Sequence, residues 1–500
     1  MMFKSNQTTA ENPCVFVIFG GTGDLTKRKL IPALFSLFER KKLPKNFAIV
    51  ATGRKSMLDE EFKELIKKEL QSLIGNRLNE TVWGEFCKLF FYFIFDFSSE
   101  TENFNRLREY LDTVDRDFST EGNRIYYLAV APAYFCTIIT RLKGNGLLEN
   151  QGSWQRVMVE KPFGTSLEMA KDLNEEILKS LAEENIFRID HYLGKEMVQN
   201  IIVIRFCNSI FESMWNHKYI DNIQIISSEK IGVEQRGGYY ENTGILKDML
   251  QNHILQMLSL ICMEAPVDLS PEAIRDEKVK VLKSLRLFDK ETDHDKIILG
   301  QYGKGQMNGE DVIGYRDEDK VDVDSTTPTF VALKTYVDNF RWGGVPIYLR
   351  AGKRLDRRIS EIIIQFKKLP GTDYYDVFSK TEPNVLKIRI HPAEGIFFTI
   401  NAKKPGIKME IEKVGVDYCQ IYQDSDKTYE PYEHIIIGAI QNNPSFFTRW
   451  DEIENSWNYI RSIADAMKNK KADYPNYAAG SKGPKEVENF LDVDGRKWWG

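Results

Sequence analysis

Five short apolar segments alternate with longer helical patterns in the first half of the chain. Each segment is almost continuously apolar, as expected for a strand buried on both faces of a sheet. The expected strands are residues 15–19, 47–51, 91–95, 125–130 and 156–159, with helical runs at residues 61–72 and 102–114 between them. Strands joined by helical crossovers pair in parallel and are covered by helices on both faces. The pattern predicts a Rossmann-like, doubly wound α/β sheet with ligands at the carboxyl ends of its strands.

The second half of the chain has a different pattern. An amphipathic helical run at residues 246–263 is followed by short β-type segments without helices between them. These segments are residues 329–336, 362–366, 386–391 and 397–401. Such a series predicts a mostly antiparallel sheet, hence an α+β domain. A chain of 500 residues with 42% apolar residues is long enough for two domains, and we place them at residues 1–188 and 189–500.

Charge and cysteine content exclude several classes of protein. A net charge of -5 argues against nucleic-acid binding driven by phosphate neutralisation. The six cysteines show no CxxC or metal-finger spacing, which indicates reduced thiols and predicts no metal site. The N-terminal residues are polar, and no apolar run approaches the ~20 residues of a membrane span. We therefore expect a soluble, cytoplasmic protein that does not bind membranes.

A glycine-rich loop follows the first expected strand directly and opens into a helical run at residues 25–38. Its residues are Gly20, Gly21, Thr22, Gly23, Asp24, Leu25, Thr26 and Lys27. Glycines at a strand-to-helix turn allow the backbone to approach a phosphate, so the loop predicts a dinucleotide site. The match to GxGxxG is imperfect, because Thr26 stands where the third small residue belongs. A turn that binds nothing remains the alternative, whereas a P-loop lacks its Gly-Lys-Ser/Thr ending.

The end of the second expected strand indicates which cofactor fits. NAD-binding enzymes place Asp or Glu there, against the ribose hydroxyls. This chain has Thr52-Gly53-Arg54-Lys55 instead. Arg54 can pair with a 2′-phosphate, so NADP is expected in preference to NAD. The alternative is that Arg54 only covers the edge of the sheet.

The run from Arg188 to Glu196 gathers several polar groups behind a strand-like segment. His191 and Lys195 carry or can carry positive charge, and with the Tyr192 hydroxyl they can hold a phosphate dianion. Asp190 is then available to orient a base. The alternative is a solvated strand end followed by a turn.

His253 is the candidate general base. Apolar residues at three- and four-residue spacing share its side of the expected helix, so its imidazole should point inward. A core histidine without a catalytic role is the alternative, because only geometry to a substrate separates the two. Asp248 lies five residues from His253, which on a regular helix places the two side chains well apart around the axis.

Several ordered motifs along the chain resemble those of glucose-6-phosphate dehydrogenases. They are Gly20–Leu25, Glu160-Lys161-Pro162-Phe163-Gly164, the run from Arg188 to Glu196, Arg236-Gly237-Gly238-Tyr239-Tyr240, Gln251-Asn252-His253 and the run from Val345 to Lys353. The resemblance covers most of the chain. It implies oxidation of glucose 6-phosphate to a lactone with reduction of NADP, the first step of the oxidative pentose phosphate pathway. It also implies a homodimer or a dimer of dimers built on the second domain.

The resemblance assigns roles by matching position. His253 is implied as the base and Asp190 as its orienting carboxylate. The implied cofactor contacts beyond the glycine loop and Arg54 are Asp96, Phe97 and Lys161. The implied substrate contacts are Lys161, His191, Tyr192, Lys195, Glu229, Asp248, Lys353 and Arg358.

Departures from the family pattern limit the resemblance. Phe397 and Thr399 stand where animal members have a tyrosine and a lysine of a second, structural NADP site, so we expect no second cofactor. Two other functions fit parts of the pattern. A related sugar oxidoreductase would share the first half and Lys161-Pro162 but would not need His191, Tyr192 and Lys195. A non-enzymatic NADP-binding protein would lack the pair of Asp190 and His253.

Overall fold

The computed structural model describes residues 12–97, 101–149, 152–369, 378, 381–419, 429–470 and 473–500. The polar N-terminal residues before Asn12 lie outside the described residues. The chain divides into two compact units. Unit 1 comprises Met1–Lys195, Val267–Arg275 and Tyr429–Asp451, and unit 2 comprises Glu196–Pro266, Asp276–Thr428 and Glu452–Gly500.

Unit 1 is built on a seven-stranded sheet in the order β18-β6-β5-β4-β1-β2-β3. Its strands are β1 (Cys14–Phe19), β2 (Phe47–Gly53), β3 (Phe90–Ile94), β4 (Arg124–Leu128), β5 (Gln155–Val159), β6 (Ile186–Ile189) and β18 (Phe447–Thr448). All neighbours pair in parallel except β18 with β6. The order β3-β2-β1-β4-β5-β6 is that of the doubly wound dinucleotide fold, which confirms the predicted α/β class.

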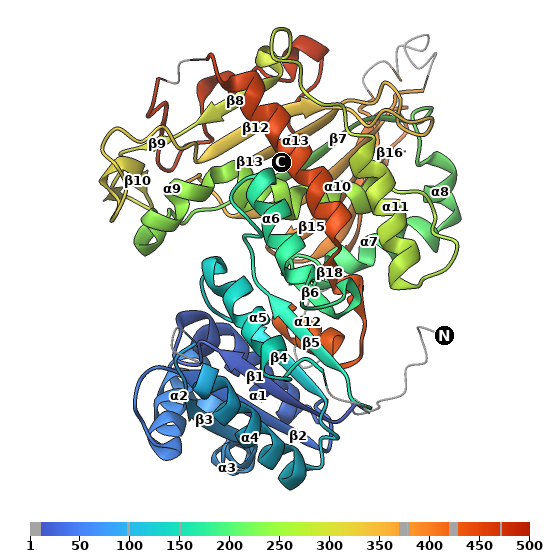
Figure 1. The fold of residues 1–500 in the computed structure, drawn as a ribbon. Coiled ribbons are helices and arrows are strands. Elements are labelled where there is room, and N and C mark those ends of the chain that lie inside the picture. Colours follow the sequence, from blue (N-terminus) through green and yellow to red (C-terminus); the bar gives the residue numbers. More distant parts are fainter. Residues whose placement is uncertain are drawn as a thin grey trace. The chain divides into compact units, whose positions relative to one another are not determined.

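Helices cover both faces of this sheet (Figure 1). They are α1 (Ile31–Glu39), α2 (Asp59–Ile74), α3 (Glu80–Phe86), α4 (Thr101–Phe118), α5 (Phe135–Gly144), α6 (Leu167–Leu178) and α12 (Pro431–Ile440). One hydrophobic cluster joins Phe16 and Ile18 of β1 to residues of α1, α2, α3 and α12. Phe19, whose side chain points to the opposite face, makes an edge-to-face contact with Phe95, and Phe95 makes another with Phe104 of α4. Both faces of the central strands are thus buried, as their continuous apolar sequences predict.

Two segments from late in the sequence belong to unit 1. The sequence-based division at residue 188 assigns Val267–Arg275 and Tyr429–Asp451 to the second domain, whereas they pack with the first in the structure. The physical reason for the later segment is strand pairing, since β18 extends the sheet beyond β6. The earlier segment is joined to it through Arg275, which donates to the carbonyls of Pro444 and Phe447. A strand of two residues has no periodicity that a sequence pattern could reveal.

Unit 2 is built on an eight-stranded sheet in the order β17-β16-β15-β14-β7-β13-β12-β8. Its strands are β7 (Ile220–Ser228), β8 (Ile297–Gly300), β12 (Phe330–Thr335), β13 (Ile347–Gly352), β14 (Ile359–Phe366), β15 (Val385–His391), β16 (Gly395–Lys403) and β17 (Ile411–Cys419). The sheet is mostly antiparallel, which confirms the predicted α+β class. Its single parallel pair is β7 with β13.

The helices of unit 2 include the segment predicted around His253. They are α7 (Glu196–Phe206), α8 (Ser209–Met214), α9 (Gly237–Ile245), η7 (Leu246–Ile254) and α10 (Leu255–Cys262). Two helices, α11 (Pro271–Lys283) and α13 (Trp450–Met467), have residues in both units. Two fully buried tryptophans fix the end of α10. The indole N–H of Trp215 donates to the carbonyl of Ile261, and that of Trp342 donates to the carbonyl of Cys262.

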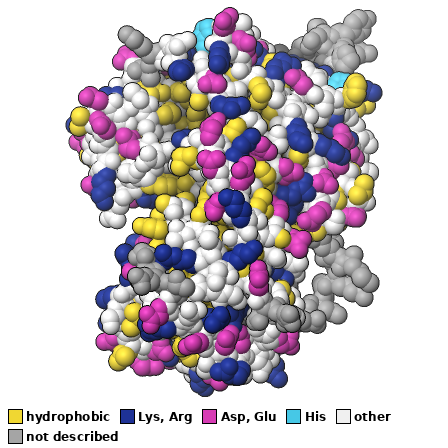
Figure 2. Space-filling model, viewed as in Figure 1, with side chains coloured by type: hydrophobic (Ala, Val, Ile, Leu, Met, Phe, Trp, Pro, Cys, Tyr) yellow, Lys and Arg dark blue, Asp and Glu magenta, His cyan; other side chains and the backbone are white. Residues whose placement is uncertain are grey.

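Charged side chains of both signs are interspersed over the face that Figure 2 shows. The six cysteines form no disulfide. Within the described residues, no helix is both long enough and apolar enough to cross a membrane. Because positive and negative groups are mixed on this face, an anionic ligand would be held by a local cluster rather than by a broad basic surface.

Candidate functional site

The glycine loop follows β1 and lies between the carboxyl ends of β2 and β4, the two strands that flank β1 in the sheet. Gly20 has φ +93°, and an added Cβ there would lie 2.4 Å from the carbonyl oxygen of Ala129, just after β4. On the other side, the N–H of Gly21 donates to the carbonyl of Thr52 at 2.7 Å. The N–H of Gly23 donates to the carbonyl of Gly20 at 2.9 Å, which closes the turn. This backbone cradle at the switch point of the sheet fits the pyrophosphate of a dinucleotide.

Thr26, the residue that breaks the GxGxxG pattern, is part of the cradle. It is buried, and its hydroxyl donates to the carbonyl of Gly20 at 2.9 Å. The neighbouring charges pair at the surface, with Lys27 on Glu69 and Asp24 on Arg28. Thr22 and Leu25 are half-buried. A threonine therefore holds the turn here by a hydrogen bond, where other loops rely on a third small residue.

Arg54 lies directly after β2 and is exposed. Within the described part of the chain, its guanidinium forms neither a hydrogen bond nor an ion pair. The turn beneath it is held by Tyr92, whose hydroxyl donates to the carbonyl of Lys55 at 2.8 Å. Arg54 is thus available for a phosphate at the carboxyl end of β2, next to the glycine loop.

The next strand end carries Asp96 and Phe97, both half-buried. The N–H of Phe95 donates to the carbonyl of Gly53, so β2 and β3 end side by side. The Phe97 ring lies 4.9 Å from the ring of Tyr134, and Arg141 donates to the Phe97 carbonyl at 2.7 Å. Sequence reasoning missed Tyr134, an exposed aromatic after β4 that could line the cofactor side of this edge. The only signal for it was its position after an expected strand.

Lys161 follows β5 and begins a turn with a cis peptide bond to Pro162. Glu160 beside it accepts hydrogen bonds from the Tyr127 hydroxyl at 2.5 Å and the Tyr432 hydroxyl at 3.1 Å. Burial raises the pKa of Glu160, and these two hydrogen bonds and Lys161 oppose that shift. Tyr432 belongs to α12, so a late segment of the chain holds the backbone next to Lys161.

The predicted phosphate-binding residues lie on one tight turn after β6. The Asp190 carboxylate is buried and accepts a 3.0 Å hydrogen bond from the N–H of Tyr192. The ammonium group of Lys195 lies 3.4 Å from the centre of the Tyr192 ring, and the rings of His191 and Tyr192 are 5.1 Å apart. The turn is compact because Gly194 has no side chain. An added Cβ at Gly194 would lie 2.5 Å from the carbonyl oxygen of Pro431.

In unit 2, a buried lysine lies between two carboxylates. The ammonium group of Lys353 is 2.5 Å from Glu229 and 3.1 Å from Asp248. The cluster follows from the parallel pair, since Ser228 of β7 is in register with Gly352 of β13 and the next residues are Glu229 and Lys353. Burial lowers the pKa of Lys353, but the charges and hydrogen bonds of both carboxylates outweigh it, so the pKa lies above its ordinary value. Lys353 is therefore charged at neutral pH.

Asp248 and His253 lie on η7, which is a π-helix rather than the regular helix expected from the sequence. A π-helix closes its hydrogen bonds between residues five apart, so positions 248 and 253 are about one turn apart on the same side. Both side chains are buried. The geometric conflict that a regular helix posed for these two residues is therefore removed. π-Helical turns are rare and are frequent at functional sites.

The predicted residues thus fall into two groups, one in each unit. Unit 1 contains the loop at residues 20–27, Arg54, Asp96, Phe97, Lys161 and the turn at residues 190–195. Unit 2 contains Glu229, Asp248, His253, Lys353 and Arg358. Arg358 is exposed, directly before β14, and within the described residues its side chain has no hydrogen bond or ion pair.

Two family models match the chain. The model of the glucose-6-phosphate dehydrogenase NAD binding domain matches residues 17–200, and the model of the C-terminal domain of the same family matches residues 202–499. Glucose-6-phosphate 1-dehydrogenase of Bacillus subtilis is 43% identical over 493 residues, which cover 99% of each chain. The protein of that name from Borreliella burgdorferi is 43% identical over 487 residues, covering 96% of each chain.

Solved structures with a similar fold agree with these matches. A glucose-6-phosphate dehydrogenase in complex with its substrate glucose-6-phosphate has a TM-score of 0.88 and 35% identity, covering 99% of this chain and 100% of that one. The Mycobacterium avium glucose-6-phosphate 1-dehydrogenase has a TM-score of 0.82 and 30% identity, covering 98% and 99%. Gal80p of Saccharomyces cerevisiae, at a TM-score of 0.50 and 11% identity, shares the fold alone. The first domain accordingly binds a nicotinamide dinucleotide.

Lys353 should stabilise the folded protein in a way that depends on pH. Replacing Lys353 with Met leaves buried carboxylate charge without its partner, so we expect a loss of roughly 3 kcal/mol of unfolding free energy near neutral pH. Because the pKa of Lys353 is raised in the folded state, its contribution is complete below the ordinary value of 10.5 and declines as the pH rises through the raised value. Urea unfolding of wild type and Lys353→Met across this range measures the difference.

Lys304→Met is the matched control, because the Lys304 side chain is 76% exposed beside Asp317. An exposed pair contributes at most about 1 kcal/mol, so this variant should unfold almost like wild type. A difference between wild type and Lys353→Met that grows as the pH rises above 10.5 would contradict the assignment of Lys353 as a charged partner of the two acids.

Proposed function

Because the chain belongs to the glucose-6-phosphate dehydrogenase family, we propose that it oxidises β-D-glucose 6-phosphate to 6-phospho-D-glucono-1,5-lactone and reduces NADP to NADPH. This is the first step of the oxidative pentose phosphate pathway. The observation that carries the proposal is the full-length similarity to a dehydrogenase solved with glucose 6-phosphate, together with the polar groups found at the strand ends of both units. In this proposal, residues 1–188 bind NADP, residues 189–500 together with Lys161 hold the sugar, and residues 189–500 form the dimer.

The phosphate of the substrate is assigned to His191, Tyr192 and Lys195. These residues share one turn, and the contact of Lys195 with the Tyr192 ring holds two of the donors together. An ammonium group, an imidazolium and a phenol can all donate to a phosphate dianion. The sugar hydroxyls are assigned to Lys161, Glu229, Asp248, Lys353 and Arg358, whose charged groups can donate to or accept from a hydroxyl.

His253 is the proposed general base. Its neutral imidazole takes the proton of the C1 hydroxyl as the hydride leaves C1, and the bound nicotinamide ring supplies the hydride acceptor. Asp190 is proposed to bind the other ring nitrogen of His253. A buried carboxylate in that place fixes the tautomer of the imidazole and stabilises the imidazolium that forms. The bond from the Tyr192 N–H to Asp190 supports this role, because it holds the carboxylate in one orientation.

An absorbance assay for NADPH formation tests both the role of His253 as general base and the preference for a phosphorylated sugar. Wild-type protein should turn over glucose 6-phosphate much faster than glucose, because glucose lacks the group that the 190–195 turn binds. His253→Asn should lower kcat by a factor of 10² to 10⁴, the usual contribution of a general base. Asp190→Asn should lower kcat as well, with a smaller effect on KM.

His294→Asn is the control for this assay, since His294 is exposed and lies far along the chain from the proposed site residues. It should leave both constants unchanged. High activity of the His253→Asn variant would remove His253 from its role, and equal turnover of glucose would remove the phosphate assignment.

NADP is the proposed cofactor because Arg54 stands where an NAD enzyme carries an acid. The free guanidinium of Arg54 supports pairing with the 2′-phosphate, which NAD lacks. Arg54→Ala should therefore raise KM for NADP at least tenfold and leave KM for NAD within twofold. Arg77→Ala, which also removes a surface arginine from unit 1, is the control. A parallel rise in both constants would contradict the assignment.

A homodimer, or a dimer of dimers, is the proposed assembly. The hairpin of β16 and β17 lies at the edge of the large sheet and carries apolar side chains in register on one face. The pairs are Ile396 with Tyr418, Phe398 with Val416 and Ile400 with Val414. Val416 is 56% and Tyr418 is 57% exposed. Exposed apolar side chains next to each other on a sheet edge favour a protein partner, here a second copy of the chain.

Sedimentation velocity of Val416→Asp tests this assembly. A buried charge at the interface should shift the protein from dimer to monomer at micromolar concentration, whereas Val493→Asp, at a position that is 92% exposed, should not. A dimer that persists in Val416→Asp would move the interface elsewhere.

A cytoplasmic location without nucleic-acid or membrane partners completes the proposal. Six unpaired cysteines support a reducing compartment. Fractionation of cells that produce the protein would check the location.

A further inference from the structure

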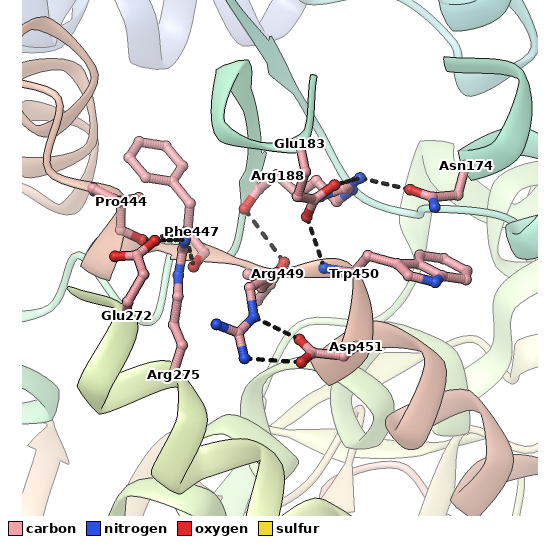
Figure 3. Close-up of polar contacts among 11 residues, drawn as sticks. Asn174, Glu183, Arg188, Glu272, Arg275, Pro444, Phe447, Arg449, Trp450 and Asp451 are labelled. Carbon is pink, nitrogen blue, oxygen red and sulfur yellow. Dashed lines mark hydrogen bonds and ion pairs between the residues drawn. The ribbon is translucent and has the colours of Figure 1, made fainter. Parts of the chain in front are cut away.

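Arg188, two residues before Asp190, has a buried side chain whose two terminal nitrogens both form hydrogen bonds. Its guanidinium donates to both carboxylate oxygens of Glu183, at 2.6 and 2.8 Å, and to Asn174 at 2.6 Å (Figure 3). The side chain is 2% exposed. A bidentate pair of this kind fixes the direction of both side chains, because the planar fork of arginine matches a carboxylate in one orientation.

The guanidinium also contacts the turn after the neighbouring strand. It lies over the ring of Phe163, 4.9 Å from the ring centre. Phe163 is two residues after Lys161, and Arg188 is two residues before Asp190. A single side chain therefore joins the backbone that carries Lys161 to the backbone that carries the 190–195 turn.

A remote segment of the chain holds this pair from the other side. The backbone N–H of Trp450 donates to Glu183 at 3.0 Å, and the Thr448 hydroxyl donates to the carbonyl of Arg188 at 3.4 Å. β18 itself pairs with β6, with Thr448 opposite Arg188. Arg275 fixes β18 in turn by donating to the carbonyls of Pro444 and Phe447, at 2.5 and 3.1 Å (Figure 3).

We propose that Arg188 is a positioning residue for substrate binding, with Glu183 and the β18 segment as its support. It sets the spacing between Lys161 and the 190–195 turn, so that the sugar and phosphate contacts of unit 1 fit one hexose phosphate. The inference rests on the proposed function, because it takes the 190–195 turn as the phosphate site. The pair is half-buried, with Arg188 2% and Glu183 35% exposed. Ion pairs that bury a charge are often neutral for net stability, so the geometry that this pair imposes is its more specific contribution.

Arg188→Lys tests the role, because lysine keeps the charge but cannot form the forked contact. We expect KM for glucose 6-phosphate to rise about tenfold or more, as a displacement of about 1 Å in a binding group can cost a factor of 10². KM for NADP and kcat at saturating sugar phosphate should stay within twofold. Glu183→Gln, which keeps an acceptor for the Trp450 N–H, should shift the same constant in the same direction by less.

Arg124→Lys is the matched control. Arg124 is also 2% exposed and, like Arg188, donates to two other side chains, here Asp115 at 3.0 Å and Asp112 at 2.6 Å. It lies at the start of β4, the opposite edge of the sheet from the strand ends that carry the site. If the role of Arg188 were purely structural, both lysine variants would lower the melting temperature and leave KM for the sugar phosphate unchanged.

The outcomes separate the inference from the proposed function. A rise in KM for the sugar phosphate with Arg188→Lys, or with Glu183→Gln if the first variant does not fold, and none with Arg124→Lys supports the inference. Equal effects of Arg188→Lys and Arg124→Lys on KM for the sugar phosphate overturn the inference. Equal rises in KM for the sugar phosphate and KM for NADP in Arg188→Lys also overturn it. Lys195→Ala in the same assay reports on the phosphate site alone. If it raises KM for the sugar phosphate while Arg188→Lys does not, the positioning role fails and the proposed function stands.

Discussion

Parallel pairing of neighbouring strands is the constraint on which both groups of candidate residues depend. Strands that run in the same direction end at the same edge of a sheet, so the residues that follow them are brought together whatever their distance in sequence. In unit 1 this edge collects the glycine loop after β1, Arg54 after β2, Phe97 after β3 and Lys161 after β5. In unit 2 the parallel pair within the eight-stranded sheet, β7 with β13, brings Glu229 next to Lys353, while the other neighbours described in that sheet are antiparallel.

The features that the sequence predicts well are those with local signals. The first five strands are recognisable because strands buried on both faces are continuously apolar, and the helical runs at residues 25–38, 61–72 and 102–114 correspond to α1, α2 and α4. The glycine loop was recognisable because the chain needs a positive φ at Gly20, where a side chain would also collide with Ala129. The candidate site residues were named mainly through family motifs, and their joint action across the two units remains a proposal.

The features that the sequence does not predict depend on contacts between distant residues. Nothing local to Phe447 and Thr448 indicates a strand, because their pairing with β6 is what makes them one. The parallel pair β7 with β13 is likewise hidden in a series of β-type segments without helical crossovers. The π-helix at η7 was not predicted, because apolar residues spaced three and four apart do not show where the backbone hydrogen bonds change to five-residue spacing. That shift is what places Asp248 and His253 on one side.

The charges around Lys353 and on the 190–195 turn indicate which part of a hexose phosphate each would bind in the proposed function. Lys353 neutralises only one of its two carboxylate partners, so the cluster with Glu229 and Asp248 carries excess negative charge. Such a cluster accepts hydrogen bonds from hydroxyls but repels a phosphate dianion. The turn with His191 and Lys195 has the opposite preference. In the proposed function, the phosphate of the substrate is therefore assigned to the turn with His191 and Lys195, and the sugar hydroxyls are assigned to the cluster around Lys353. The charge of each cluster supports its own assignment, because a carboxylate-rich cluster accepts from hydroxyls and a cationic turn donates to a phosphate.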